Sequence, residues 1–105
     1  MTVIRFLKNA KGICGFKISG HSTADSEDEI GRIVCSAVSS AAYLTANTIS
    51  EIVQEPCNIT VNDAEMILQA EDPSPVTVTL LKGLQLHLTE LSKQYPNHIS
   101  IFSEV

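Results

Sequence analysis

A cysteine and a histidine stand out as the side chains whose placement suits nucleophilic catalysis. His21 follows Gly20 directly at the end of a strand-like segment, and Cys35 lies early in a long helical pattern. A thiol attacks as its thiolate, and a nearby imidazole can take the thiol proton and later protonate the leaving amine. Gly20 has no side chain and permits a close approach between the strand end and the helix start. His21 and Cys35 are therefore a candidate catalytic pair.

The helical segment around Cys35 adds two features to that chemistry. Arg32 lies three residues earlier, and its positive charge favours a thiolate, as the helix start does to a smaller extent. Ser39 lies four residues after Cys35, so both belong to the same helix face, and Ser36 and Ser40 flank it. This strip of small and polar side chains is predicted to line a peptide groove.

The same residues also have ordinary structural interpretations, which the pattern alone leaves open. A cysteine beside an apolar helical stripe is usually a small buried hydrophobe, and a loop histidine is usually solvated. Cys14 and Cys57 lie in strand-like segments and are interpreted as structural, while His87 and His98 are interpreted as surface residues. The cysteines show no CxxC spacing, which argues against a disulfide framework and against a zinc site. No metal and no cofactor is predicted.

The bulk composition indicates one soluble domain over residues 1–105, with 44% hydrophobic and 18% charged residues. No apolar run is long enough to span a membrane, and no signal peptide is apparent at the N-terminus, so a cytoplasmic location is expected. The net charge of −5, with only seven Lys and Arg, argues against direct nucleic-acid binding and favours a basic partner.

Hydrophobic periodicity and turn residues predict the elements that hold the candidate pair. They are strands over 2–8 and 13–20, a helix over 30–53, strands over 57–62 and 66–70, a helix over 76–95 and a strand over 98–102. Cys14, Phe16 and Ile18 alternate onto one strand face. The order ββαββαβ predicts an α+β fold, with an antiparallel or mixed sheet packed against two helices.

Each predicted helix carries an apolar stripe that should form its buried face. The stripe of the first helix comprises Ile30, Ile33, Val34, Ala37, Val38, Ala41, Leu44, Thr45, Ile49 and Ile52, and that of the second comprises Leu80, Leu81, Leu84, Leu88 and Leu91. Cys35 lies beside the first stripe, next to the core.

The Gly20-His21 dipeptide, the short acidic loop after it and the run Ile33-Val-Cys-Ser-Ala-Val-Ser39 together resemble the signature of the ribosomal-processing cysteine protease family, Prp. The segment from Lys82 to Pro96 looks like that family's closing helix, so the resemblance covers nearly the whole chain. It implies a homodimeric endopeptidase that removes an N-terminal extension from the large-subunit ribosomal protein numbered twenty-seven during ribosome assembly.

The resemblance also implies roles for individual residues. His21 and Cys35 would be the catalytic pair, Gly20 and Ser39 supporting residues, and residues 22–29 a flexible loop over the site. The family usually has an aspartate three residues before the cysteine, where this chain has Arg32. Asp28 or Glu29 is an alternative source of that carboxylate, or no third catalytic residue is needed.

The acidic loop has two interpretations. Asp25 and Glu27 are predicted to attract the basic N-terminal extension of a ribosomal protein, since opposite charges steer the encounter. Alternatively, the loop only solvates and caps the helix. A non-catalytic module that binds a ribosomal protein remains the alternative function. A structural dimerisation domain is a third, which would explain Leu86 lying off the main stripe.

Overall fold

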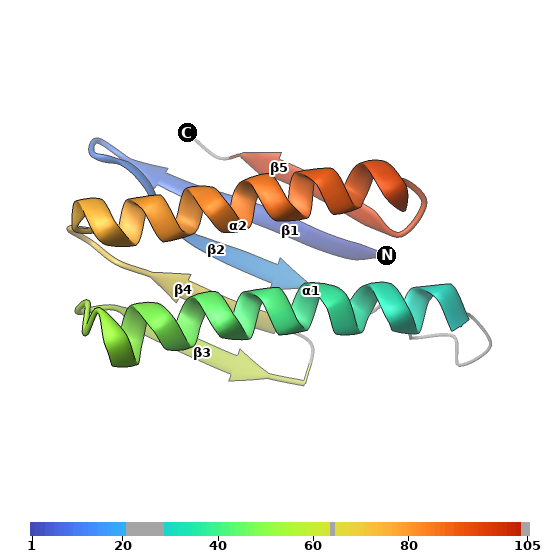
Figure 1. Cartoon of the computed structure of the whole chain (residues 1–105), viewed down its shortest axis with the longest axis horizontal. Helices are drawn as coiled ribbons and strands as arrows, with labels where there is room; N and C mark the ends of the chain where they lie inside the picture. The colour runs from blue at the N-terminus through green and yellow to red at the C-terminus, as the bar shows by residue number, and fades with distance from the viewer. Residues whose placement is uncertain (21–28, 64, 104–105) are drawn as a thin grey trace.

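The structure is a computed structural model, and it describes residues 1–20, 29–63 and 65–103. Within these ranges the elements confirm the predicted ββαββαβ order and the α+β class (Figure 1). They are β1 (Thr2–Asn9), β2 (Gly12–Ser19), α1 (Glu29–Asn47), the π-helical turn η1 (Thr48–Ile52), β3 (Asn58–Asn62), β4 (Glu65–Gln69), α2 (Pro75–Gln94) and β5 (Ile99–Ser103).

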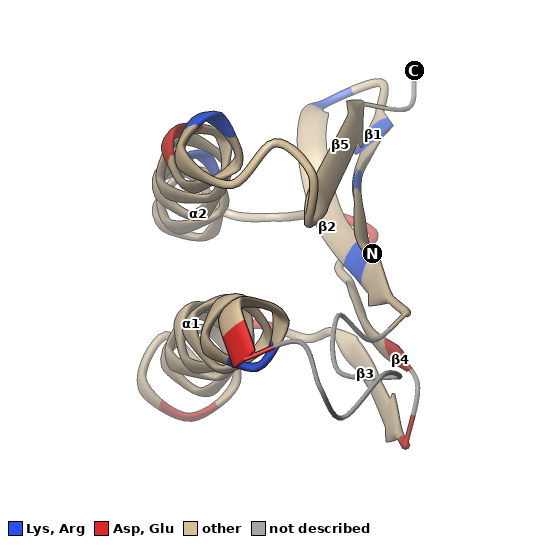
Figure 2. Cartoon of the chain, turned by 90° about the vertical axis from the view of Figure 1, so that its right-hand side faces the viewer, with Lys and Arg blue, Asp and Glu red and all other residues tan. Residues whose placement is uncertain are grey.

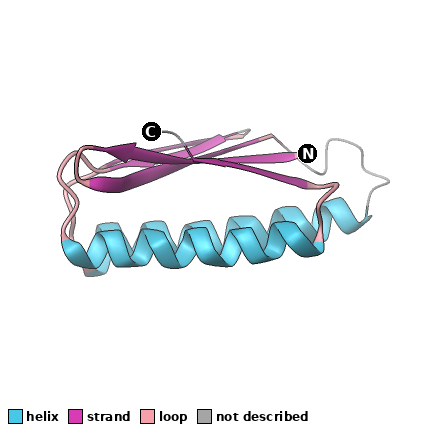
Figure 3. Ribbon diagram, turned by 90° about the horizontal axis from the view of Figure 1, so that it is seen from above, coloured by secondary structure: helices cyan, strands magenta, loops and turns pink. Residues whose placement is uncertain are grey.

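The strands form a mixed sheet whose order, across the described residues, is β3-β4-β2-β1-β5. The pairing of β1 with β5 is parallel, and the other neighbours are antiparallel. Both helices lie on one face of this sheet, which leaves the other face open (Figure 3). α2 covers the half formed by β1 and β5, and α1 covers the half formed by β3 and β4 (Figures 1 and 2). No described helix has the length and apolar character needed to cross a membrane.

The first hairpin departs from simple alternation. Phe16 is fully buried in the core and Ile18 packs against it, as predicted. However, the β1–β2 register shifts between Leu7 and Lys8, and the chain then buries Ile13 and Cys14 in succession. A bulge of this kind adds one residue to a strand and breaks its two-residue period, so Ile13 joins the core cluster as well.

The buried face of α1 is narrower than the predicted stripe, because the helix contacts the rest of the chain on only one side. Its buried residues are Gly31, Val34, Val38, Ala42 and Ala46, followed by Ile49 in η1. Ile30, Ile33, Leu44 and Ile52 were expected in the core but are between 51% and 78% exposed. The expectation was therefore wrong for these residues, and they form part of an apolar surface on the outer side of the helix.

In α2, the predicted stripe is largely confirmed. Leu81, Leu84 and Leu88 are buried in the core, and Leu80 and Leu91 pack against it. The helix begins at Pro75, one residue before the predicted start, and Ser74 caps it by accepting a hydrogen bond from the Thr77 amide. Proline suits this first position, because the N–H it lacks would have no partner inside the helix.

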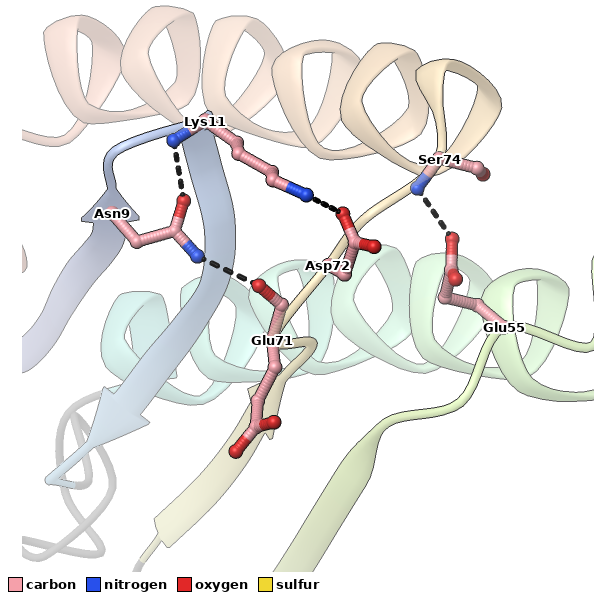
Figure 4. A network of polar contacts seen from close by, with 6 residues as sticks. All are labelled: Asn9, Lys11, Glu55, Glu71, Asp72 and Ser74. Atoms are coloured by element: carbon pink, nitrogen blue, oxygen red, sulfur yellow. Dashed lines mark hydrogen bonds and ion pairs between the residues drawn. The ribbon is translucent and has the colours of Figure 1, made fainter.

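Polar contacts fix the end of the molecule where η1 stops and α2 begins (Figure 4). Glu55 Oε1 accepts hydrogen bonds from the Thr77 hydroxyl at 2.5 Å and from the Ser74 amide at 2.8 Å. These bonds, the Thr77 bond foremost, lower the pKa of the Glu55 carboxyl. On the neighbouring turn, Lys11 pairs with Asp72. This network lies at the far end of α1 from Glu29, where that helix begins (Figure 1).

Candidate active site

A cleft of about 180 Å³ opens beside Cys35, between α1 and the part of the sheet where β2 and β3 end and β4 begins. Cys35 is half-buried in the second turn of α1, next to the buried Val34. The α1 side of the cleft presents Cys35, Ser39 and Tyr43, which follow one another at four-residue intervals. Residues at this spacing share a helix face, so α1 places a thiol, a hydroxyl and a phenol in one row.

The end of β2 forms another wall of the cleft, and its geometry requires a glycine. Gly20 has a φ of +82°, a conformation that residues with a side chain rarely adopt. A Cβ at this position would lie 2.6 Å from the carbonyl oxygen of Met1. The close contact at Gly20 is therefore with the backbone of Met1, and it is not the predicted approach between the strand end and the helix start.

The structure brings three of the predicted site residues together, since Gly20, Cys35 and Ser39 all line this cleft. His21, the residue after Gly20, lies outside the described residues. So do Asp25, Glu27 and the rest of the loop predicted to cover the site, apart from Glu29, which begins α1 and is exposed.

The predicted serine strip does not form one surface. Ser39 faces the cleft, whereas Ser40 lines a separate groove between α1 and α2. Ser36 is exposed beside the row. Successive helix residues are turned by about 100°, so only every third or fourth residue could share the cleft with Cys35.

Several cleft residues were not predicted from the sequence. Tyr43 continues the spacing of Cys35 and Ser39, and that spacing could have identified it. Asn62, Asp63 and Glu65 come from the hairpin between β3 and β4, and only the tertiary fold brings this hairpin next to α1. Within the described residues, no cluster of three or more His, Cys, Asp or Glu side chains is suited to hold a metal ion.

This hairpin contributes the carboxylates of Asp63 and Glu65 to the cleft. Asp63 is exposed at the turn, and the Glu65 carboxylate lies 3.3 Å from the ammonium of Lys17 on β2. Arg32 of α1, where the resemblance led us to expect an aspartate, is exposed and is not among the described residues that line the cleft.

The sequence model of the cysteine protease Prp family matches residues 1–100. The chain belongs to the cysteine protease Prp family. No curated protein matches it in a sequence comparison. The catalytic signature of Gly20-His21 and Cys35 predicted from the sequence thus occurs in a chain whose family consists of cysteine proteases.

Solved structures share the fold over almost the whole chain. Two are of the essential ribosomal processing protease Prp from S. aureus, one with a substrate peptide and one with a covalently linked product peptide. They superpose with TM-scores of 0.87 and 0.85 at 18% identity, covering 99% of this chain and 100% of theirs. The structure of SMU.848 from Streptococcus mutans has a TM-score of 0.82 at 17% identity, covering 99% of this chain and 96% of its own.

Thiol reactivity offers a first test of the site. Burial raises the pKa of the Cys14 thiol, and burial together with the charge of Glu55 raises the pKa of the Cys57 thiol. At neutral pH, Cys14 and Cys57 therefore hold less thiolate than a thiol of ordinary pKa. Cys35, by contrast, lines the cleft, where a reagent can reach it. We expect one equivalent of iodoacetamide at pH 7 to modify Cys35 first, as read by peptide mass spectrometry. Equal modification of all three cysteines would contradict a distinct Cys35 environment.

Proposed function

We propose that this protein removes the N-terminal extension of the large-subunit ribosomal protein numbered twenty-seven during ribosome assembly, in the cytoplasm where ribosomes are made. The observation that carries the proposal is the position of Cys35 in a cleft whose wall includes Gly20, the residue directly before His21. Membership of the cysteine protease Prp family supports the same chemistry.

The proposed reaction runs in two steps. His21 takes the proton of the Cys35 thiol, and the thiolate attacks the carbonyl carbon of the scissile peptide bond. His21 then protonates the departing amine, which leaves as the new N-terminus of the ribosomal protein, and the extension remains as a thioester on Cys35. Water, deprotonated by His21, attacks the thioester and releases the extension as a carboxylic acid while the thiol is restored.

The similar S. aureus protein supports both the substrate class and the covalent step. It is described as an essential ribosomal processing protease, and its structures hold a substrate peptide and a covalently linked product peptide. This chain has the same fold and belongs to the same family, which supports the same type of processing.

Incubation of the purified protein with the extended ribosomal protein from the same organism tests this function. We expect loss of the extension, with a single new N-terminus identified by mass spectrometry. The alternative, a non-catalytic module that binds a ribosomal protein, predicts binding of the extended protein without cleavage. No cleavage under reducing conditions that keep Cys35 free would contradict the proposed function.

The acidic loop is proposed to steer the substrate. Asp25 and Glu27 lie near His21 in the sequence, and a ribosomal protein is generally basic after its extension. We expect the double variant Asp25→Asn, Glu27→Gln to lower kcat/KM severalfold at low salt and to leave kcat largely unchanged, because steering acts on encounter. Asp28 and Glu29 are left intact because they adjoin or begin α1, where they favour the helix start.

The measurement is kcat/KM against ionic strength for wild type and the double variant. Exposed charges are screened beyond about 8 Å at physiological salt, so the two curves should converge as salt is added. Identical salt dependence for the two proteins would mean that the loop only solvates and caps.

We also propose that the chain forms a homodimer through the outer face of its helices. Between α1 and α2 runs a solvent-open groove lined by Ala41 and Leu44 of α1 and by Leu80 and Gly83 of α2. Leu44 is 70% exposed, and a Cβ at Gly83 would meet nothing within 4 Å. A helical glycine costs about 1 kcal/mol relative to alanine, and small residues in such a groove allow a second helix to approach closely.

Leu44→Lys is therefore expected to shift the protein to a monomer in sedimentation velocity experiments, because it places a charge in the centre of the proposed interface. Ser36→Lys is the matched control, since Ser36 is exposed on the same helix but does not line the groove. An unchanged sedimentation coefficient for Leu44→Lys would rule out this face as the dimer interface.

A further inference from the structure

Tyr43 takes no part in the proposed reaction, yet it lies in the cleft that contains Cys35. It lines that cleft and is 45% exposed. The other tyrosine, Tyr95, packs against the hydrophobic core, and Phe6 and Phe16 are fully buried within it. Tyr43 belongs neither to the described core cluster nor to the hydrophobic residues packed against it. A half-open aromatic ring offers a ligand a large apolar area, and tyrosine is accordingly enriched in binding surfaces.

Apolar residues reach this cleft from both the helix and the sheet. On α1, Val38 and Ala42 line the cleft and are 1% exposed each. Val61 of β3 lines it from the sheet and is 49% exposed. Val61 is paired with the buried Met66, so its side chain points to the helix side of the sheet. A polar side chain bound against these residues would lose water without gaining a partner, whereas an apolar side chain would be favoured there.

The carboxylates of the cleft lie away from Tyr43. They belong to Asp63 and Glu65, at the turn between β3 and β4, and Glu65 is paired with Ser19 at the end of β2. This turn lies at the end of the sheet nearer the start of α1 (Figure 1). Tyr43 lies about two helical turns further along α1 than Cys35. Selection of an apolar side chain is therefore expected at the Tyr43 end of the cleft.

The spacing along α1 indicates which residue of a bound peptide would reach Tyr43. Tyr43 follows Cys35 by eight residues, which is about 12 Å along the helix axis. An extended peptide that runs along the α1 wall covers this distance in three to four residues, at about 3.3 Å each. The residue at Tyr43 would therefore be the third or fourth from the bond that is cut, and not one of the two residues that flank this bond.

We propose that Tyr43 is a specificity-determining residue, whose ring and Val61 together bind an apolar side chain of the substrate three or four residues from the scissile bond. This inference rests on the proposed function and specifies one substrate position that the cleft selects. The occupant is the substrate peptide because the same cleft contains the thiol, so a peptide attacked by Cys35 can continue along the cleft to Tyr43. Such a contact acts on binding and leaves the attacking groups unchanged.

The test measures binding to the Cys35→Ala variant, so that cleavage cannot interfere. Fluorescein-labelled peptides span the junction between the extension and the mature ribosomal protein. Each carries leucine at one position, from the second to the fifth on either side of the scissile bond, and a matched peptide carries serine there. Kd is measured by fluorescence anisotropy, and again with Tyr43→Ser, Tyr43→Phe or Ile52→Ser added. Ile52 is the control, because it is 78% exposed in η1 and does not line the cleft.

With Tyr43 intact, we expect leucine to lower Kd about tenfold relative to serine at one position, the third or the fourth, as partial burial of a leucine side chain allows. Tyr43→Ser should reduce this preference to about twofold or less, whereas Tyr43→Phe and Ile52→Ser should retain it. The melting temperature of each variant is recorded, and the peptide comparison with Tyr43 intact needs no variant at that position.

Equal Kd values for leucine and serine at the third and fourth positions, or no binding of any peptide, would overturn this inference. So would a preference confined to the second or fifth position, or one that survives Tyr43→Ser. Loss of the preference in Tyr43→Phe would also overturn it, because the effect would then belong to the hydroxyl and not to the ring. The proposed function is decided separately, by cleavage of the extended ribosomal protein by the wild-type chain.

Discussion

The Cys35→Ala variant is expected to lose cleavage of the extended ribosomal protein completely, while remaining folded. Without the thiol no thioester can form. Ser39 and Tyr43 also line the cleft, but their hydroxyls are much weaker nucleophiles than a thiolate. Cys35 is half-buried beside the core rather than inside it, so the loss of one sulfur atom should disturb packing little. The measurement is the rate of appearance of the mature N-terminus, with the melting temperature recorded for the same sample.

Cys57→Ala is the matched control for this experiment. Cys57 is also half-buried and packs against the core, but it lies after η1 and does not line the cleft. It should keep the wild-type rate. Cleavage by Cys35→Ala at the wild-type rate would exclude Cys35 as the nucleophile, and equal loss in both variants would indicate a general effect of removing a thiol.

The elements of this fold could be predicted because each has a strong local signal. The alternation around Phe16 identified β2, and Pro56 and Pro75 marked where one helix region ends and the next begins. The buried face of α1 was harder to predict, since nearly every turn of that helix carries apolar residues on two sides. Ile33 and Leu44 have the same helical spacing as core residues, and only the position of the sheet decides that Val34 and Val38 are the buried ones.

The two walls of the candidate site also differ in how far they could be predicted from the sequence. The α1 wall could be predicted, because Cys35 and Ser39 are related by helix geometry and Tyr43 continues their row. The opposite wall could not, because the hairpin that carries Asn62 and Asp63 reaches the cleft only through the sheet order, in which β4 lies between β2 and β3. Nothing in the local sequence of β3 indicates that it borders Cys35.

The sheet order also explains why the cleft is at this side of the molecule. α1 lies over the β3–β4 half of the sheet, and Gly20, directly after β2, lies next to the backbone of Met1. The α1 row of Cys35, Ser39 and Tyr43 therefore lines the same cleft as Gly20. The residue that follows it is His21.

His21→Ala is accordingly expected to lower kcat/KM by about 10²–10⁴-fold, the usual contribution of a general base and acid. The imidazole has two tasks in the proposed reaction, since it removes the thiol proton and protonates the leaving amine. The wild-type rate should therefore depend on the protonation of this imidazole as the pH is varied, and the variant should lack that dependence. A residue with only a structural role would lower the rate without changing the pH profile.

His87→Ala is the control, because His87 is an exposed histidine of α2 that does not line the cleft. It does line the groove proposed as the dimer interface, so the sedimentation coefficient of this variant is recorded with its rate. It should retain both the rate and the pH profile of the wild type. The experiment measures kcat/KM from pH 5 to 9 for the three proteins at one ionic strength. If His21→Ala kept the wild-type rate and pH profile, His21 would not be the group that takes the proton from the Cys35 thiol. The carboxylates of Asp63 and Glu65 would then be the first alternatives to test, because both residues line the same cleft.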